Sequence, residues 1–275
     1  MRKKLGVVPY VLARPLVHGL GEASSKFELE YADPVSVAVK MREGSLDVAF
    51  LSPMDYALNS PDYSIVPGIG VSSPSANRSV LLAFQRGLRK IKSVAVANAS
   101  TSEVMMARIL LAEKYEVNPT FVPLPSTRSL TIEAMLRRAD AALIAGDESI
   151  LRQDSIESAL DLSEEWSDLS DLPFVHGFWV VRSNMLAKEE LRMLQESKER
   201  GVNELEDIAT EAAKQVGLAA ERVTKLLTSL AFDLDEEDVE SLREFLRFAF
   251  YHGILGEVPE IRFLEIEQEP NPHFN

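Results

Sequence analysis

The chain of 275 residues has no cysteine and only four histidines. The absence of cysteine excludes disulfides, thiolate catalysis, and zinc or iron–sulfur sites held by cysteine. The histidines are too widely spaced for an HExxH-type metal site; they are His18, His176, His252 and His273. A metal held by carboxylates alone stays open, although no pattern in the sequence indicates one.

Basic residues are scarce relative to acidic ones. There are 29 lysines and arginines against 43 aspartates and glutamates, which gives a formal net charge of -14 and a pI near 4.8. This balance disfavours binding to nucleic acid or to an anionic membrane surface, because both need a basic face. The 46% hydrophobic and 26% charged residues are typical of an ordinary globular protein. A chain of this length fits two domains better than one core.

Long hydrophobic runs are also missing, and no window of the sequence is long enough to span a membrane. The basic start 1–4 precedes an apolar stretch, 5–13, that could be taken for a secretion signal. Pro9 and then Arg14 interrupt this stretch before any small-residue cleavage site. We therefore interpret it as the first β-strand of a cytoplasmic protein.

Short apolar runs alternate with helical patterns through the first two thirds of the chain. This alternation is typical of βαβ units in a mostly parallel sheet. Beyond residue 182 only helical spacing remains, which predicts a C-terminal tail of helices. The expected strands include 27–31, 46–51, 94–97, 120–124 and 141–145, and the expected helices of the tail are 187–198, 204–216, 219–230 and 236–255.

Two apolar strands, 78–86 and 172–182, frame the middle third of the chain. Between them lies enough strand-helix alternation for a small domain. A chain that leaves one lobe and returns to it makes two lobes joined by a double hinge, and ligand clefts favour such domain interfaces. We expect one lobe at 1–85 plus 178–275, the other at 86–177, and a small-molecule cleft between them.

Small polar residues follow four of the expected strands, where a parallel sheet presents its ligands. They occur in 10–14, 52–53, 99–102 and 146–147. The hydroxyl residues Ser100, Thr101 and Ser102 begin an expected helix, so that backbone N–H groups and the helix dipole could hold an anion there. The same hydroxyls could instead only cap the helix.

Three further residues allow both a functional and a structural interpretation. Arg14 could pair with a ligand carboxylate through its planar fork, or with a surface acid such as Asp33. Asp147 could orient or deprotonate a substrate hydroxyl, or cap the segment that follows it. His176 could face the cleft or be a hydrogen-bonded histidine of the core. The residues alone therefore indicate a small anionic ligand between two lobes, and they specify no reaction.

Five short motifs, in the same order, resemble those of the chorismate dehydratase family, the first enzymes of the futalosine route to menaquinone. The stretch 8–16 resembles the opening signature of that family. The other motifs are 46–52 with 55–57, 78–82, 141–147 and 161–175, the last through Asp161-Leu162, Trp166 and Leu172–Val175. The resemblance spans roughly residues 5 to 182 and is weaker in the helical tail.

The resemblance implies an α/β fold like that of type 2 periplasmic binding proteins, used inside the cell as an enzyme. The implied reaction removes water from chorismate to give 3-[(1-carboxyvinyl)oxy]benzoate, without metal or organic cofactor, because formation of an aromatic ring drives it. The protein then needs mainly to hold two carboxylates and the leaving hydroxyl. We expect Ser79 and Asp147 to be catalytic and the following residues to bind substrate: Arg14, Ser52, Arg78, Ser100, Thr101, Ser102, Gly146 and His176.

Two positions depart from the family pattern. Leu12 stands where members usually have asparagine, and Thr101 where they commonly have arginine. Because loss of one transition-state hydrogen bond costs about 3–4 kcal/mol, two such changes leave other functions open. One alternative is a non-catalytic cytoplasmic binder of a carboxylated metabolite. Another is 1,4-dihydroxy-6-naphthoate synthase, whose usual opening pattern with cysteine is absent here. The apolar faces of the last helices serve either the core or a homodimer contact.

Overall fold

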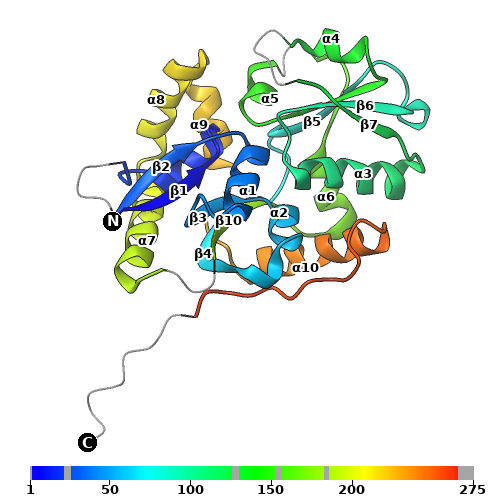
Figure 1. Cartoon of the computed structure of the whole chain (residues 1–275). Coiled ribbons are helices and arrows are strands. Elements are labelled where there is room, and N and C mark those ends of the chain that lie inside the picture. The colour runs from blue at the N-terminus through cyan, green and yellow to red at the C-terminus, as the bar shows by residue number, and fades with distance from the viewer. Residues whose placement is uncertain (1, 22–25, 126–129, 153–155, 183–185, 266–275) are drawn as a thin grey trace, which may run out of the picture.

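The computed structural model describes residues 2–21, 26–125, 130–152, 156–182 and 186–265. Two five-stranded sheets form the cores of two lobes, which lie side by side in Figure 1. The expected two-lobed α/β fold is confirmed. Among the residues described, no helix combines the length and the apolar character that a membrane span needs.

The first sheet has the strand order β2-β1-β3-β10-β4. Its strands are β1 (Lys3–Val7), β2 (Phe27–Tyr31), β3 (Val48–Leu51), β4 (Tyr63–Ser73) and β10 (Phe174–Arg182). Strand β1 pairs in parallel with β2 and β3, whereas β10 runs antiparallel to β3 and β4. The sheet is therefore mixed rather than mostly parallel, because the chain enters it a last time from the opposite end.

The second sheet has the order β7-β6-β8-β5-β9. Its strands are β5 (Val80–Phe84), β6 (Ser93–Ala97), β7 (Thr120–Pro123), β8 (Ala141–Ala145) and β9 (Ala159–Asp161). Both faces are covered, as alternate residues of β8 show: Leu143 faces the main core, while Ala142 and Ile144 belong to a smaller cluster with α4 (Ile132–Leu136). A strand buried on both faces is apolar throughout, which is why 141–145 is readable from the sequence.

The pairing of the hinge strands favours lobe boundaries that differ from the expected ones. A division after residue 85 leaves β5 in the first lobe, but β5 pairs with β8 and β9 of the second sheet. A division after residue 177 cuts β10, whose partners all lie in the first sheet. The chain changes sheets between 73 and 80 and returns between 161 and 174. We propose these two crossings as the limits of the lobes.

The remaining helices lie around the two sheets. The first lobe carries the 3-10 helices η1 (Val11–Val17) and η2 (Ser60–Asp62), with α1 (Pro34–Arg42) and α2 (Pro53–Ala57); the second carries η3 (Leu88–Lys90), α3 (Thr101–Tyr115), α5 (Asp147–Arg152) and α6 (Leu162–Ser170). The predicted helical tail is confirmed as α7 (Lys188–Asn203), α8 (Leu205–Val216), α9 (Ala220–Thr228) and α10 (Glu236–Tyr251).

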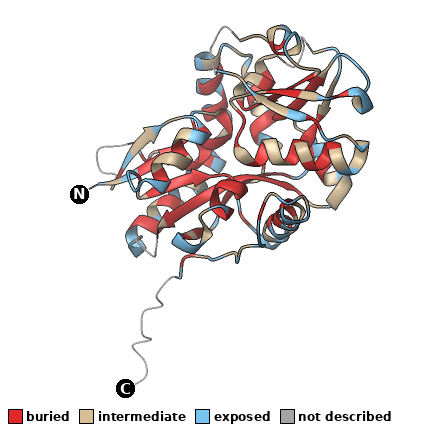
Figure 2. Ribbon diagram, turned by 45° about the vertical axis from the view of Figure 1, so that its right-hand side comes forward, coloured by how far each residue is buried: buried red, intermediate tan, exposed pale blue. Residues whose placement is uncertain are grey.

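The tail helices return to both lobes. Helices α7, α8 and α9 pack against η1 of the first lobe, and α7 comes so close that a Cβ on Gly201 would lie 2.0 Å from the carbonyl oxygen of Pro15. Helix α10 packs on β10 and also reaches the second lobe, where Trp166 of α6 makes edge contacts with Phe245 and Phe248. One cluster of buried apolar side chains extends from one lobe into the other, and Figure 2 shows buried segments in both lobes.

Candidate functional site

A small cavity lies where the two lobes meet. From the first lobe it is lined by residues at the carboxyl ends of β1 and β3, and from the second by the start of α3. The lining residues are Val8, Tyr10, Leu12, Pro34, Phe50, Ser52, Asp55, Ser100, Glu103 and His176. We call this the central cavity. Its volume of about 20 Å³ holds only one or two water molecules, so the lobes are closed upon each other.

Two helix starts face the central cavity, each with a hydroxyl cap and a carboxyl group one turn later. Ser52 donates from Oγ to Oδ2 of Asp55 over 2.6 Å at the start of α2. At the start of α3, the Ser100 N–H donates to Oε2 of Glu103 over 2.6 Å, and the Glu103 N–H donates to Ser100 Oγ over 3.2 Å. This reciprocal capping box fixes the α3 terminus and holds the Glu103 carboxyl group inside the cavity.

Hydrogen bonds between the lobes close the cavity. The Thr101 hydroxyl donates to Oδ1 of Asp55 over 2.7 Å, and Oγ of Ser102 accepts from the Met54 N–H over 2.8 Å. The Tyr10 hydroxyl donates to the carbonyl oxygen of Asn98 over 2.9 Å. The acceptors across this contact are therefore a carboxylate, a hydroxyl and a carbonyl, and both lobes supply donors.

The turn between β8 and α5 makes a further contact between the lobes. Oδ1 of Asp147 accepts from the Val11 N–H over 2.8 Å. The preceding residue, Gly146, has a φ of +64°, and a Cβ there would lie 3.1 Å from the ring of Tyr10. Only glycine combines this backbone conformation with such a close approach. Asp147 and Gly146 thus secure the docking of the second lobe on the first.

Burial shifts the protonation of the acids in the central cavity. It raises the pKa of Glu103 to about 7, with the Asp55 charge adding to the effect and the capping bonds opposing it. It also raises the pKa of Asp55, which the hydroxyls of Ser52 and Thr101 partly offset. No lysine or arginine is among the lining residues. The cavity can therefore hold a carboxyl proton at neutral pH.

His176 contributes a neutral imidazole. Burial lowers the pKa of His176 to about 4. Its Nε2 lies 2.6 Å from Oγ of Ser73 and 3.5 Å from Oγ of Ser79, while Nδ1 is buried without a partner in the described part of the chain. A buried ring nitrogen without a hydrogen bond is costly, and it marks a place where a ligand or a water molecule would bind. Ser79 itself donates from Oγ to Asn77 Oδ1 over 2.6 Å.

The structure brings most of the expected site residues together. Ser52, Ser100 and His176 line the central cavity, and the remaining neighbours are Ser79, Thr101, Ser102, Gly146 and Asp147, through the contacts given above. Arg14 and Arg78 lie elsewhere. Arg14 lines a neighbouring cavity of about 410 Å³ in the first lobe, which shares Val8 and Tyr10 with the central cavity, and its guanidinium donates to Oε1 of Gln215 over 2.8 Å. Arg78 lines a cavity of about 440 Å³ on the hinge side.

Two acids of the central cavity were not expected from the sequence, since Asp55 and Glu103 supply its carboxyl groups. Tyr10, in the expected segment 10–14, packs against Gly146. A signal for Glu103 exists, since Ser100 followed three residues later by glutamate is a capping-box pattern. That pattern gives no sign that the carboxyl group is buried, because burial depends on the facing lobe.

Comparison with known proteins places the chain in a biosynthetic family. A family model described as menaquinone biosynthesis matches residues 3–251. Chorismate dehydratase of Thermus thermophilus is 24% identical over 260 residues, which cover 88% of this chain and 93% of that protein. The resemblance seen in the sequence motifs is thus confirmed at the level of the family.

Solved structures share the fold at lower identity. Protein AF1704 of Archaeoglobus fulgidus superposes with a TM-score of 0.76 at 20% identity, covering 92% of this chain and 98% of that one. The alkanesulfonate-binding protein SsuA of Xanthomonas axonopodis pv. citri, solved with bound MOPS, gives 0.67 at 14% identity and covers 96% of each chain. The Candida albicans CA3427 product, described as having the generic periplasmic binding protein fold, gives 0.68 at 14%, covering 98% and 99%. The expected periplasmic-binding-protein-like fold is confirmed, and the chain belongs to the menaquinone biosynthesis family.

Proposed function

We propose that this chain is a chorismate dehydratase, which converts chorismate to 3-[(1-carboxyvinyl)oxy]benzoate and water. The family, the Thermus relative and the five motifs support this proposal. One observation of the structure supports it further: N–H and hydroxyl donors at the start of α3 and in the first lobe gather where the lobes meet, and the protein's own carboxylates accept from them.

The substrate carboxylates replace these internal acceptors when the lobes separate. The Thr101 hydroxyl then donates to a substrate oxygen in place of Asp55, and the Val11 N–H donates to a substrate oxygen in place of Asp147. Each donor keeps one hydrogen bond in this exchange. The free energy of closing the lobes over substrate is therefore little less favourable than that of closing them without substrate. Asp55 and Asp147, released from these donors, would repel a bound anion unless protonated. The raised pKa of each favours the protonated form.

The elimination breaks one C–H bond and one C–O bond of the ring. The C–H electron pair forms the last double bond of the aromatic ring, and a carboxylate takes the released ring proton and passes it to the hydroxyl, which leaves as water. Glu103, with a pKa of about 7, can carry that proton at neutral pH and return to the carboxylate form in the step. The hydroxyl of Ser79 and the neutral His176 beside it can orient the substrate.

The direct test is turnover by the purified chain without added cofactor, followed by mass spectrometry. We expect chorismate to be replaced by a product lighter by one water molecule. Glu103→Gln should lower kcat by at least about 100-fold, because proton transfer by a positioned side chain contributes that much or more. The exposed Glu206→Gln of α8 is the matched control and should leave the rate unchanged. Chorismate that stays intact at stoichiometric enzyme would exclude the proposal.

A second candidate is a binder of a small carboxylated metabolite that does no chemistry. The apolar Leu12 in the cavity wall, where a polar group would otherwise contact the substrate, favours it. Thermal unfolding with chorismate separates the two candidates, since a ligand that binds the folded chain raises its melting temperature. A rise without any product would favour the binder, whereas a rise accompanied by product supports the dehydratase.

A further inference from the structure

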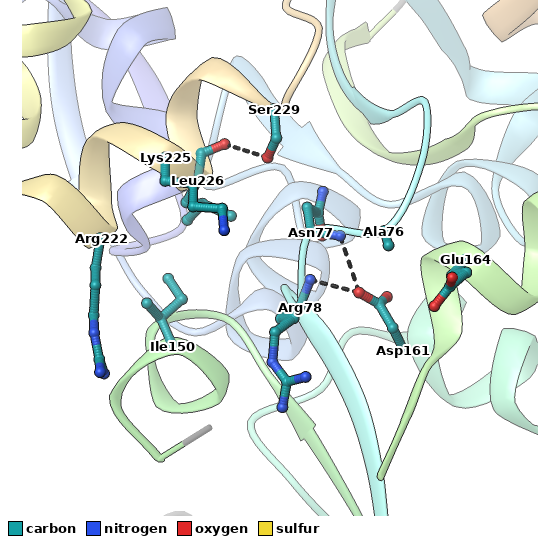
Figure 3. Close-up of a pocket in the computed structure, with 10 residues that line it drawn as sticks. All are labelled: Ala76, Asn77, Arg78, Ile150, Asp161, Glu164, Arg222, Lys225, Leu226 and Ser229. Atoms are coloured by element: carbon teal, nitrogen blue, oxygen red, sulfur yellow. Dashed lines mark hydrogen bonds between the residues drawn. The ribbon is translucent and has the colours of Figure 1, made fainter. Parts of the chain in front are cut away.

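A second cavity on the hinge side gathers basic side chains from both lobes. This hinge cavity, of about 440 Å³, is drawn in Figure 3. Helix α9 of the first lobe contributes Arg222 and Lys225, and the turn before β5 contributes Arg78. None of its lining residues lines the central cavity. Its volume is within the range of sites for small metabolites.

The position of Arg78 depends on an unusual backbone conformation. Its φ is +62°, in the left-handed region that favours glycine. The carboxylate of Asp161 holds the turn: Oδ2 accepts from the N–H groups of Asn77 and Arg78 over 2.9 and 2.6 Å, and Oδ1 accepts from the Ser163 N–H over 3.0 Å. Two of these hydrogen bonds thus keep a non-glycine residue in a conformation that costs about 1–2 kcal/mol, and the third fixes the Asp161 carboxylate. The side chain of Arg78 lines the hinge cavity.

The two basic residues of α9 lie on one face of the helix. Arg222 and Lys225 are three residues apart, and side chains at that spacing are neighbours on a helix surface. Their like charges repel each other. Ile150 and Leu226 supply apolar surface beside them. The cavity therefore offers charge and apolar contact together, which suits a small organic ion better than a simple one.

The two acids that line the hinge cavity are engaged by N–H groups or exposed to solvent. Of its two acids, Asp161 already accepts three N–H groups, and Glu164 lies exposed at the start of α6. Among the residues that the structure describes, neither Arg78 nor Lys225 forms an ion pair through its side chain. This concentration of positive charge occurs in a chain whose net charge is -14.

We infer that the hinge cavity is a binding site for a small organic dianion, a phosphate ester or a polycarboxylate, separate from the central cavity. The Arg78 guanidinium offers a planar fork to two oxygens, and the Lys225 ammonium supplies a second charge from the opposite lobe. An anion held by both residues bridges the lobes. It binds the closed arrangement in preference to an open one, and so favours closure of the central cavity.

Calorimetric titration with inorganic pyrophosphate, and separately with citrate, tests this site. The wild-type chain should bind at least one probe saturably, at one site per chain, with a dissociation constant below about 1 mM. Lys225→Gln and Arg78→Gln should each weaken binding about tenfold or more, because a charged hydrogen bond contributes about 1.5–3 kcal/mol. Lys90→Gln, an exposed residue of η3, is the matched control and should bind as the wild type does.

The two probes distinguish a phosphate site from a carboxylate site. Only the probe whose chemistry matches the site should bind the wild type about tenfold more tightly than it binds Lys225→Gln or Arg78→Gln. Circular dichroism confirms that each variant is folded. Equal weakening in Lys90→Gln would mean that binding follows total charge, and an absence of saturable binding by the wild type would likewise overturn the inference. The titration contains no chorismate, so its result does not depend on whether the chain catalyses the proposed reaction. Failure of the hinge site and failure of the proposed function are therefore distinguishable.

Discussion

Glu103 provides a stability test of the buried acid in the central cavity. Its pKa rises from 4.5 to about 7 because burial penalises the charged carboxylate. The folded state therefore binds more protons than the unfolded state between these two values, and Glu103 makes the chain less stable as the pH rises through that window. Since one pKa unit corresponds to 1.36 kcal/mol, the penalty above about pH 7 is roughly 3 kcal/mol.

Glu103→Gln removes the charge and keeps the cap. An amide oxygen can still accept from the Ser100 N–H, because glutamine serves in a capping box as glutamate does. The variant should match the wild type below about pH 4.5 and exceed its free energy of unfolding by roughly 3 kcal/mol above about pH 7. The negative charge of Asp55, whose own pKa is also raised, contributes to the raised pKa of Glu103. In an Asp55→Asn background, the difference in unfolding free energy between chains with and without Glu103→Gln should therefore be smaller.

Urea denaturation at several pH values measures the difference directly. His176 contributes in the opposite direction, since its pKa is lowered from 6.5 to about 4 and its contribution to stability grows as the pH rises between these values. For this reason the comparison is between variant and wild type at each pH, which cancels His176. The exposed Glu206→Gln serves as the control. A difference that does not change with pH would refute the burial of an acid in this cavity.

Three other substitutions test the packing and the hinge. Gly201→Ala would place a Cβ 2.0 Å from the Pro15 carbonyl oxygen and should lower the free energy of unfolding by about 3 kcal/mol, measured by denaturation. Gly256→Ala, with open space around it, should change it by less than about 0.5 kcal/mol; equal effects would contradict the close approach of α7. Asp161→Ala removes an acceptor of three N–H groups and should cost about 2 kcal/mol or more. It should also weaken anion binding in the hinge cavity by freeing Arg78, and unchanged binding would show that the left-handed turn does not position that arginine.

The fold could be predicted from the sequence where local patterns decide it. The tail helices and the strand 141–145 follow from apolar spacing, and Asp33 followed by proline marks the start of α1, where its carboxylate caps the helix. Strand β4 has no such signal, because Pro67 and two glycines interrupt it. It lies at the edge of its sheet, where proline is tolerated. The directions of β5 and β10 depend on distant partners, so that a local pattern cannot specify them.

The candidate site divides in the same way. Ser52 and Ser100 cap helices, and caps are visible in sequence because the partner is three residues away. Where Arg14 and Arg78 lie depends on Gln215 of α8 and on Asp161 of β9, which are 201 and 83 residues further along the chain. The burial of Glu103 likewise results from docking of the lobes. Sequence therefore gives the residue types near the cleft, and the long-range packing decides which side chains reach it.

A crystal structure with the proposed product, 3-[(1-carboxyvinyl)oxy]benzoate, tests the central cavity most directly. The account predicts one product molecule between Ser52 and Ser100, with a carboxylate on the donors of α3 and the bond from Thr101 to Asp55 opened. Product bound only beside Arg14 or in the hinge cavity, with the contacts between the lobes unchanged, would contradict it.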